Sequence, residues 1–351
     1  MNKLFPNTKS PFIASAPMFG YADGWLASAV SSAGGYGFIA GGYDFSNGSA
    51  QLQALEAELA KARALLGIQS PEEGVPIGVG CLTLQTDGLI DNALPILRKA
   101  RVTGIWLSFP QHGADHGPTI ARIRELRETD NWDVKVFVQV GTVQAAREAV
   151  ELQADVLVVQ GSDAGGHQWA HGASVMTLVP EVHDLLQELG KSGEVGVIAA
   201  GGIVDARGFA AALGLGAEGI AMGTRFIATT ECPAPDSVKE KLLSTMDGAT
   251  TTIKSRVHDV FQHTDFWHER YDGRAIIGPN YKDFLDGVGK DVITRLHDKA
   301  KANGEQERIT IWAGTGIGRI KEVVPVKQLL EAIRAEAQSV AAQIQNILGE
   351  R

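Results

Sequence analysis

The strongest constraint on the fold of this chain is a regular alternation, over its first 230 residues, between short apolar runs and amphipathic stretches. The apolar runs are rich in Val, Ile and Phe and are bordered by Gly, a pattern typical of strands buried on both faces of a parallel sheet. Eight runs have this pattern, at residues 12–16, 37–40, 76–81, 104–109, 135–140, 156–160, 196–200 and 219–222. Apolar residues at spacings of three and four predict helices between them, the clearest at residues 51–66, 120–127, 143–152 and 206–213.

Eight strand–helix units within this length predict a (β/α)8 barrel, also called a TIM barrel. A doubly wound open sheet is the alternative, because periodicity does not show whether a sheet closes on itself. No Pro/Ser-rich linker or charge run interrupts residues 1–230, so we expect this segment to form one barrel domain.

The pattern changes after Thr230, where the segment ECPAPDS interrupts the chain. We expect residues 231–351 to form a mainly helical C-terminal region that caps the barrel, with helices at 239–246, 282–301 and 326–348. The exception is the strand-like apolar run at 309–318, ITIWAGTGIG, which ends in glycines. We expect this run to return the chain to the mouth of the barrel.

Charge and cysteine content exclude several classes of protein. The 32 basic and 41 acidic residues give a net charge of −9, so the chain lacks the basic surface that binds nucleic acid or anionic membranes. Cys81 and Cys232 lie outside any CxxC spacing, which argues against a disulfide framework or a cysteine-rich metal site and favours the cytoplasm. No stretch reaches the roughly 18 apolar residues of a membrane span, and the N-terminus lacks an export-signal pattern. Small-molecule partners are expected, and a homo-oligomer is compatible with this composition.

Glycines gather at the ends of the last three predicted barrel strands, where the active sites of such barrels lie. The three segments are 160–167 (QGSDAGGH), 199–203 (AAGGI) and 221–225 (AMGTR). Gly201, Gly202 and Gly223 would let backbone N–H groups approach a ligand closely, and the loops after strands 7 and 8 are the usual phosphate site of this fold. The alternative is that Gly201 and Gly202 only form a tight turn.

These segments resemble the nitronate monooxygenases, formerly called 2-nitropropane dioxygenases. The resemblance rests on GSDAGGH, AAGGI and AMGTRF, on SAPMFG near the start and on SSAGGYGFIAGGY at the second strand, and it runs from about Pro11 to Thr230. Residues 311–318 resemble the late WAGTG segment of the family. The sequences VGC at 79–81 and QVG at 139–141 are more similar to the fungal-type branch of the family.

The resemblance implies an FMN-containing barrel that oxidises alkyl nitronates, such as propionate 3-nitronate, with molecular oxygen to a carbonyl compound and nitrite. It implies His167 as the catalytic residue. It also implies that flavin contacts fall on Pro17, Met18, Gly161, Gly166, Gly202, Ala221, Met222, Gly223 and Thr224. The family usually has Gln where this chain has Ala221, so a side-chain contact is lost there.

Two further expectations come from the residues themselves. Gln139 ends the fifth strand and could reach the edge of the flavin, although a polar side chain bonded within its own loop is an equal alternative. FMN is expected in place of FAD, because no GxGxxG motif follows a strand to hold a second phosphate and an adenosine.

The role of His167 can be argued from chemistry alone. An unperturbed imidazole changes charge near neutral pH, so it could stabilise a nitronate as the imidazolium or remove a carbon-bound proton from a neutral nitroalkane. The alternative is a histidine that only hydrogen-bonds the backbone of its loop.

The other histidines carry weaker patterns. His112 and His116 have a spacing that could hold a metal on a helix, but the flanking Pro and Gly residues favour a solvated loop, and no metal site is predicted. His258, His263 and His268 recur every five residues and are interpreted as surface or packing residues. The aromatic residues Tyr271 and Tyr281 in the C-terminal region are candidates for lining the substrate pocket.

Two other functions stay open on the sequence. One is an FMN-dependent NAD(P)H reductase of quinones or enoyl thioesters, and the other is a non-redox barrel whose glycines bind a substrate phosphate. Bleaching of the flavin by NADPH would identify the first, and a colourless protein the second.

Overall fold

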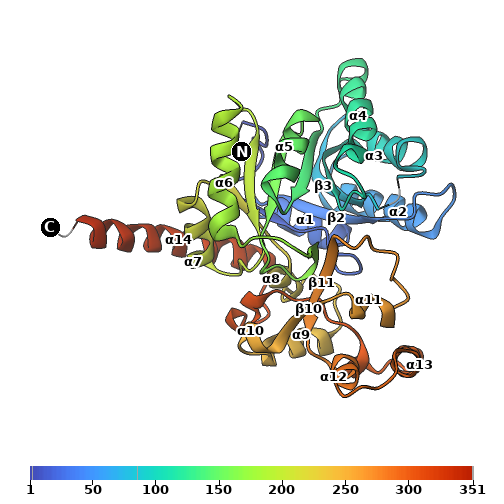
Figure 1. Ribbon diagram of the computed structural model, residues 1–351. Coiled ribbons are helices and arrows are strands. Elements are labelled where there is room, and N and C mark those ends of the chain that lie inside the picture. The colour runs from blue at the N-terminus through green and yellow to red at the C-terminus, as the bar shows by residue number, and fades with distance from the viewer. Residues whose placement is uncertain (2, 85, 350–351) are drawn as a thin grey trace.

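The computed structural model describes residues 1, 3–84 and 86–349, and its central feature is a barrel of parallel strands (Figure 1). The sheet order is β1-β9-β8-β6-β5-β4-β3-β2, and a parallel bridge between Ala14 and Tyr36 joins its two ends. This closure confirms the (β/α)8 barrel over the open sheet. The eight strands are β1 (Phe12–Ser15), β2 (Gly37–Gly42), β3 (Val75–Leu82), β4 (Val102–Ser108), β5 (Lys135–Val140), β6 (Val156–Gln160), β8 (Gly196–Ala200) and β9 (Gly219–Met222).

Four of the helices that surround the barrel begin at a side-chain cap. Asp23, Ser49, Thr142 and Asp205 each accept a hydrogen bond from a backbone N–H two or three residues ahead, which satisfies a donor that the first helical turn leaves free. The helices of this layer are α1 (Gly24–Ser32), α2 (Ala50–Leu65), the π-helix η1 (Leu89–Ala93), α3 (Leu94–Ala100), the 3-10 helix η2 (Gly113–His116), α4 (Gly117–Asp130), α5 (Val143–Glu151), α6 (Val175–Glu188), α7 (Ala206–Gly214) and α8 (Thr224–Ile227).

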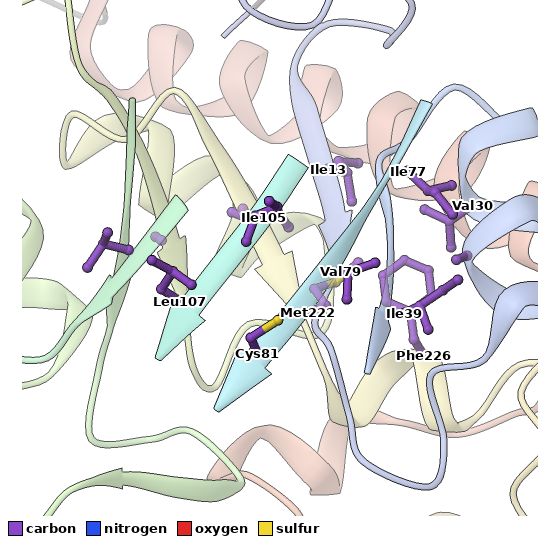
Figure 2. Packing of buried hydrophobic residues seen from close by; sticks show 14 of the residues in the cluster. Ile13, Val30, Ile39, Ile77, Val79, Cys81, Ile105, Leu107, Met222 and Phe226 are labelled. Carbon is purple, nitrogen blue, oxygen red and sulfur yellow. The ribbon is translucent and has the colours of Figure 1, made fainter. Parts of the chain in front are cut away.

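Strand side chains alternate between two apolar layers. One layer lies between strands and helices, and Figure 2 shows part of it, with Ile39, Val79 and Met222 from three different strands. The other fills the barrel interior, where Phe137 of β5 and Ala221 of β9 belong to one cluster. Because successive residues of a strand face opposite sides, Gln139 shares the inward face of Phe137, and Met222 points away from the interior.

The N-terminal segment closes one end of the barrel. Phe5 is buried against Phe12, Tyr36 and Phe137, with ring centroids 5.3, 4.7 and 5.3 Å away. Phe12 is the first residue of β1, so this plug lies at the N-terminal ends of the strands. A ligand-binding cavity is therefore expected at the opposite end.

Most of the C-terminal region lies over that opposite end, and it includes strands as well as helices (Figure 1). Its last helix, α14 (Val326–Gly349), instead packs beside the barrel, against α7 and α1. Strands β10 and β11 form an antiparallel sheet with β7 (Gly166–Trp169), which follows β6 in the chain. The elements of the region are α9 (Asp236–Ser244), α10 (Gly248–Thr251), β10 (Thr252–Ser255), α11 (Val257–Phe261), β11 (Tyr271–Ile276), α12 (Pro279–Leu285), α13 (Lys290–Ala302), the 3-10 helices η3 (Gln306–Arg308) and η4 (Thr315–Arg319), and α14 (Val326–Gly349).

Two details differ from the sequence-based expectations. Residues 282–301 are not one helix, because the chain turns between α12 and α13 at Gly287, whose φ of 81° lies in the left-handed region. The glycine-rich segment after β6 is not only a loop, because its second half is strand β7. Among the helices of the described residues, none combines the length and apolar character needed to cross a bilayer.

Candidate active site

A cavity of about 620 Å³ opens at the C-terminal ends of the barrel strands, within the roughly 300–1,000 Å³ range of small-molecule sites. Both the barrel and the C-terminal region contribute to its wall. The predicted site residues that line it are Pro17, Met18, Gln139, Gly166, His167, Gly201, Gly202, Ala221, Gly223 and Thr224.

Two predicted contact residues do not line the cavity. Met222 is 1% exposed and belongs to the layer between strands and helices. A Cβ at Gly161 would meet the backbone nitrogen of Val175 at 2.6 Å, so this glycine allows α6 to approach β6 closely. Strand alternation explains the position of Met222, and close helix packing accounts for the glycine at 161.

The ends of β8 and β9 form a glycine rim on one side of the cavity. Gly201 and Gly202 have φ values of 103° and 74°, which side chains rarely tolerate. A Cβ at Gly223 would make only ordinary van der Waals contacts, with the Met18 sulfur atom at 3.5 Å and the Ala16 Cβ at 3.8 Å. The rim is therefore open toward the cavity at Gly223, whereas the positive φ values of Gly201 and Gly202 fit the tight turn that the sequence left as the alternative there.

The late segment 312–316 packs against this rim. The Gly314 N–H donates to Thr224 Oγ1 at 3.1 Å, and the Thr315 N–H donates to the Asp163 carbonyl at 3.0 Å. The Thr315 hydroxyl also donates to Asp163 Oδ1 at 2.9 Å. The segment thus returns the chain to the barrel mouth, as expected, although its only ladder contact in the described residues is a bridge from Trp312 to Ala275.

A chain of amide hydrogen bonds crosses the cavity wall from β4 to β7. Trp106 Nε1 donates to Gln139 Oε1 at 3.0 Å, and Gln139 Nε2 donates to Gln160 Oε1 at 2.8 Å. Gln160 Nε2 in turn donates to the carbonyl of His167 at 3.0 Å. The chain fixes the direction of both amides, because each has a donor on one side and an acceptor on the other. Gln139 is therefore bonded to neighbouring strands and still faces the cavity.

His167 lies on β7, opposite Gly273 of β11, and its ring is held by residues of the C-terminal region. Its Nε2 is 2.8 Å from Asp259 Oδ1 of α11. The Trp267 ring stacks on the imidazole with centroids 3.5 Å apart and an interplanar angle of 9°. Trp312 lies at 4.8 Å. The ring partner of His167 is thus a carboxylate, whereas the sequence left open a bond to the loop backbone.

Several residues around this ring are not among the site residues that the sequence predicts. Gln160, Trp267 and Trp312 line the cavity, and Asp259 bonds the histidine. A signal existed for two of them, because Gln160 ends a predicted strand and Trp312 begins the WAGTG resemblance. None pointed to Asp259 or Trp267.

The other histidines lie in varied environments. His116 is 2% exposed and bonded to Thr83 at 2.7 Å, and burial lowers its pKa to about 4, so the prediction of a solvated loop is wrong there. Burial also lowers the pKa of His258, which packs between Tyr281 and Trp312. His263 is exposed beside Asp298. No cluster suited to a metal ion occurs among the residues described.

The two candidate tyrosines do not line the cavity. The Tyr271 hydroxyl donates to the Pro110 carbonyl at 2.7 Å, and burial raises the pKa of this phenol. Tyr281 packs beside Phe284 in a small cluster of the C-terminal region. Both side chains therefore stabilise packing around the site.

Comparison with known proteins gives a consistent assignment. Residues 118–336 match the family model described as nitronate monooxygenase. The chain is 42% identical to the nitronate monooxygenase of Neurospora crassa, an alignment that covers 98% of this chain and 94% of that protein. It is 35% identical to the nitronate monooxygenase npaC of Metarhizium robertsii, over 97% of this chain and 95% of that protein.

Solved structures share the fold at lower identity. FabK of Thermotoga maritima superposes with a TM-score of 0.74 at 24% identity, covering 99% of this chain and 98% of that one. A nitroalkane oxidase of Streptomyces ansochromogenes gives a TM-score of 0.73 at 23% identity, covering 97% and 99%. These likenesses concern the barrel and its C-terminal region. By its sequence and the full-length match to its fungal relatives, the chain belongs to the nitronate monooxygenase family of oxidoreductases.

Proposed function

We propose that this enzyme uses FMN to oxidise alkyl nitronates, such as propionate 3-nitronate, with molecular oxygen, and that it releases a carbonyl compound and nitrite. The observation that carries the proposal is one cavity that brings the glycine rim of β8 and β9 together with His167. Family membership supports oxidation of nitronates in general.

The cavity wall fits an FMN. The opening at Gly223, where a Cβ would meet no atom closer than 3.5 Å, leaves room for a phosphate beside Gly202 and Thr224. Pro17 and Met18 would flank the ring system, and Gln139 offers it an oriented amide. Gly166 and Gly201 would allow close backbone approach. With no dinucleotide motif in the sequence, the mononucleotide is the form proposed.

Bound there, a flavin would supply electron transfer between the nitronate and oxygen. The residues of this chain would do the rest. His167 would remove the carbon-bound proton of a neutral nitroalkane or pair with the charge of a nitronate. Trp267 and Trp312, which line the cavity around it, would exclude water from the reacting atoms.

The cofactor assignment is tested by absorption spectra of the purified protein and of two variants. Gly223→Ala places a methyl group where there is space, whereas Gly223→Asp directs a carboxylate at the phosphate position. We expect FMN to be retained by the first and largely lost by the second. Full flavin content in Gly223→Asp would mean that the rim does not hold the phosphate. A colourless wild-type protein that does not regain colour with FMN would reject the redox proposal.

The reaction is tested by oxygen consumption with propionate 3-nitronate and with ethylnitronate, and by nitrite release. Anaerobic mixing with NADPH separates this enzyme from a flavin reductase, because rapid bleaching of the flavin identifies the reductase.

The cysteines Cys81 and Cys232 are both buried and free, which fits a reducing compartment, and we propose the cytoplasm.

The role of His167 is tested with His167→Ala. General base catalysis contributes about 10²–10⁴ in rate, so kcat/KM on a neutral nitroalkane should fall by that factor. A preformed nitronate has already lost the proton, and its oxidation should fall much less. Equal losses on both substrates would reject the base role.

A further inference from the structure

We propose that Asp259 is a positioning residue for His167, and that it leaves Nδ1 as the ring nitrogen that takes the substrate proton. The inference deepens the proposed function and rests on it, because it assumes that His167 is the base. It assigns a task in the reaction to a residue of the C-terminal region, on a helix that starts 90 residues after His167.

The Asp259 carboxylate is buried and only partly satisfied. Its side chain is 3% exposed, and Oδ1 lies 2.8 Å from His167 Nε2. The same oxygen accepts a bond from the Thr264 hydroxyl at 3.2 Å. Oδ2 is buried with no hydrogen-bond partner in the described part of the chain. An unpaired buried carboxylate oxygen is costly, so a carboxylate kept in this state points to a task other than stability.

The orientation of the imidazole is restrained in two directions. Trp267 stacks on its face at 3.5 Å, which fixes the plane of the ring. The bond to Asp259 fixes the rotation of the ring within that plane. Both restraints come from one segment, since Asp259 lies in the middle of α11 and its carbonyl accepts the Thr264 N–H at 2.9 Å, three residues before Trp267. The ring is therefore held in one orientation, with Nε2 toward the carboxylate.

This orientation determines the tautomer of the neutral His167 ring. A carboxylate accepts hydrogen bonds, so Nε2 carries the proton and Nδ1 keeps the lone pair. His167 has no other ring-nitrogen bond in the described residues, and it lines the cavity. Nδ1 is thus the nitrogen left for a substrate.

The proton-transfer step is then balanced without an oxidant. The Cα–H bond of the nitroalkane breaks and its electron pair forms the C=N π bond of the nitronate, while the N=O π pair moves onto the oxygen and the proton goes to Nδ1. The ring becomes an imidazolium whose positive charge faces the Asp259 carboxylate. Asp259 stabilises that charge without taking the proton, as the aspartate of a catalytic triad does. A preformed nitronate skips this step.

The experiment compares nitroethane with ethylnitronate on the flavin-loaded protein. Asp259→Asn keeps the size of the side chain and offers Nε2 an amide in place of a carboxylate. We expect kcat on nitroethane to fall by roughly 10–10³, with little change in KM, and turnover of ethylnitronate to stay close to wild type. Asp259→Glu, which keeps the charge, should recover part of the loss. Asp298→Asn is the matched control, because it changes a second His–Asp pair of the same region that is exposed to solvent.

A second readout does not depend on turnover. In protein labelled with ¹⁵N-histidine, at a pH where the ring is neutral, the His167 signals should show a protonated Nε2 and a bare Nδ1. His167→Ala identifies those signals by their absence. Asp259→Asn should populate the other tautomer, whereas a carboxylate that only supports the fold would leave the tautomer unchanged.

The outcomes separate the two levels of the argument. If His167→Ala loses activity equally on nitroethane and on ethylnitronate, the base role in the proposed function fails. If His167→Ala shows the selective loss but Asp259→Asn loses both activities equally or neither, the base role stands and the positioning role is overturned. Should Asp259→Asn lose its flavin, Asp259→Glu decides: a selective loss on nitroethane supports the proposal, and wild-type selectivity overturns it.

Discussion

The packing of residues 312–316 on the barrel predicts a specific cost for adding one methyl group at Gly165. A Cβ at this glycine would lie 2.4 Å from the carbonyl carbon of Ala313 and 2.5 Å from the nitrogen of Gly314. Ordinary carbon contacts begin near 3.5 Å, so the late segment must move by about 1 Å. Both atoms belong to the backbone, and no side-chain rotation relieves the clash.

The size of the effect follows from the bonds that this movement strains. Three of the hydrogen bonds in the described structure hold the late segment on the barrel, from Gly314 N to Thr224 and from Thr315 N and Oγ1 to Asp163. Each contributes about 1 kcal/mol, and the stiffer unfolded chain of an alanine variant returns up to about 1 kcal/mol. We expect Gly165→Ala to lower the free energy of unfolding by about 2 kcal/mol. For a chain of 351 residues this corresponds to a decrease in Tm of about 3 °C.

The assay is thermal unfolding together with flavin content. Gly172→Ala is the matched control in the same connection between β6 and α6, because its Cβ would find its nearest neighbour at 3.4 Å and its φ is outside the left-handed region. The control should stay within about 0.5 kcal/mol of wild type. Flavin content should fall only in Gly165→Ala, since Gly314 bonds Thr224. If the two variants unfold alike and bind flavin alike, the late segment does not pack on this loop as described.

Three further predictions concern stability. Burial lowers the pKa of His116 to about 4 from 6.5, so between these pH values the unfolded chain binds a proton that the folded chain does not. The free energy of unfolding should therefore fall by up to about 3 kcal/mol as pH decreases through this window, and urea titrations of His116→Gln should lack that part of the slope. Arg225→Met removes buried bonds to the Ala228 and Glu322 carbonyls and should cost about 2–4 kcal/mol in urea unfolding, where no loss would show that these bonds are not formed. Arg319→Ala breaks an exposed pair with Asp205 and should cost less than about 1 kcal/mol by the same assay, so a larger loss would contradict its exposure.

The barrel could be predicted from the sequence because its strands are buried on both faces. Such strands are continuous apolar runs, and the residues that border them must allow a turn. Residues 135–140, 156–160, 196–200 and 219–222 were predicted with the bounds that β5, β6, β8 and β9 have in the structure. The closure of the sheet was a choice between two folds, and the bridge from Ala14 to Tyr36 decides it.

The second sheet could not be predicted, because its strands lack the continuous apolar runs of the barrel strands. Strands β7, β10 and β11 are short, and their sequences, GHQW, TIKS and YDGRAI, mix polar and apolar residues without a run. The pairing of β7 with β11 joins segments about 100 residues apart, such as Gly273 with His167. A local pattern carries no information on a partner at that distance, and so the segment around His167 looked like a loop.

The same limit applies within the candidate site. The glycines of β8 and β9 could be identified because a barrel places the C-terminal ends of all its strands at one mouth, whatever their separation in sequence. Strand alternation was the missing step for Met222, since its neighbour Ala221 faces the interior and two consecutive residues cannot share a face. The alternation of side chains along a strand, applied to the residues that the resemblance assigns to the flavin, excludes Met222 from the flavin contacts.

Asp259 shows where prediction from sequence requires a structure. The sequence places it between two histidines spaced as packing residues, and its charge alone would put it on the surface. What distinguishes it is its burial at 2% exposure beside His167, 92 positions earlier in the chain. Since the barrel presents the histidine and the C-terminal region presents the carboxylate and Trp267, neither part alone fixes the orientation of the ring. The selectivity between nitroalkane and nitronate should therefore depend on how the C-terminal region packs on the barrel, as well as on the residues at the barrel mouth.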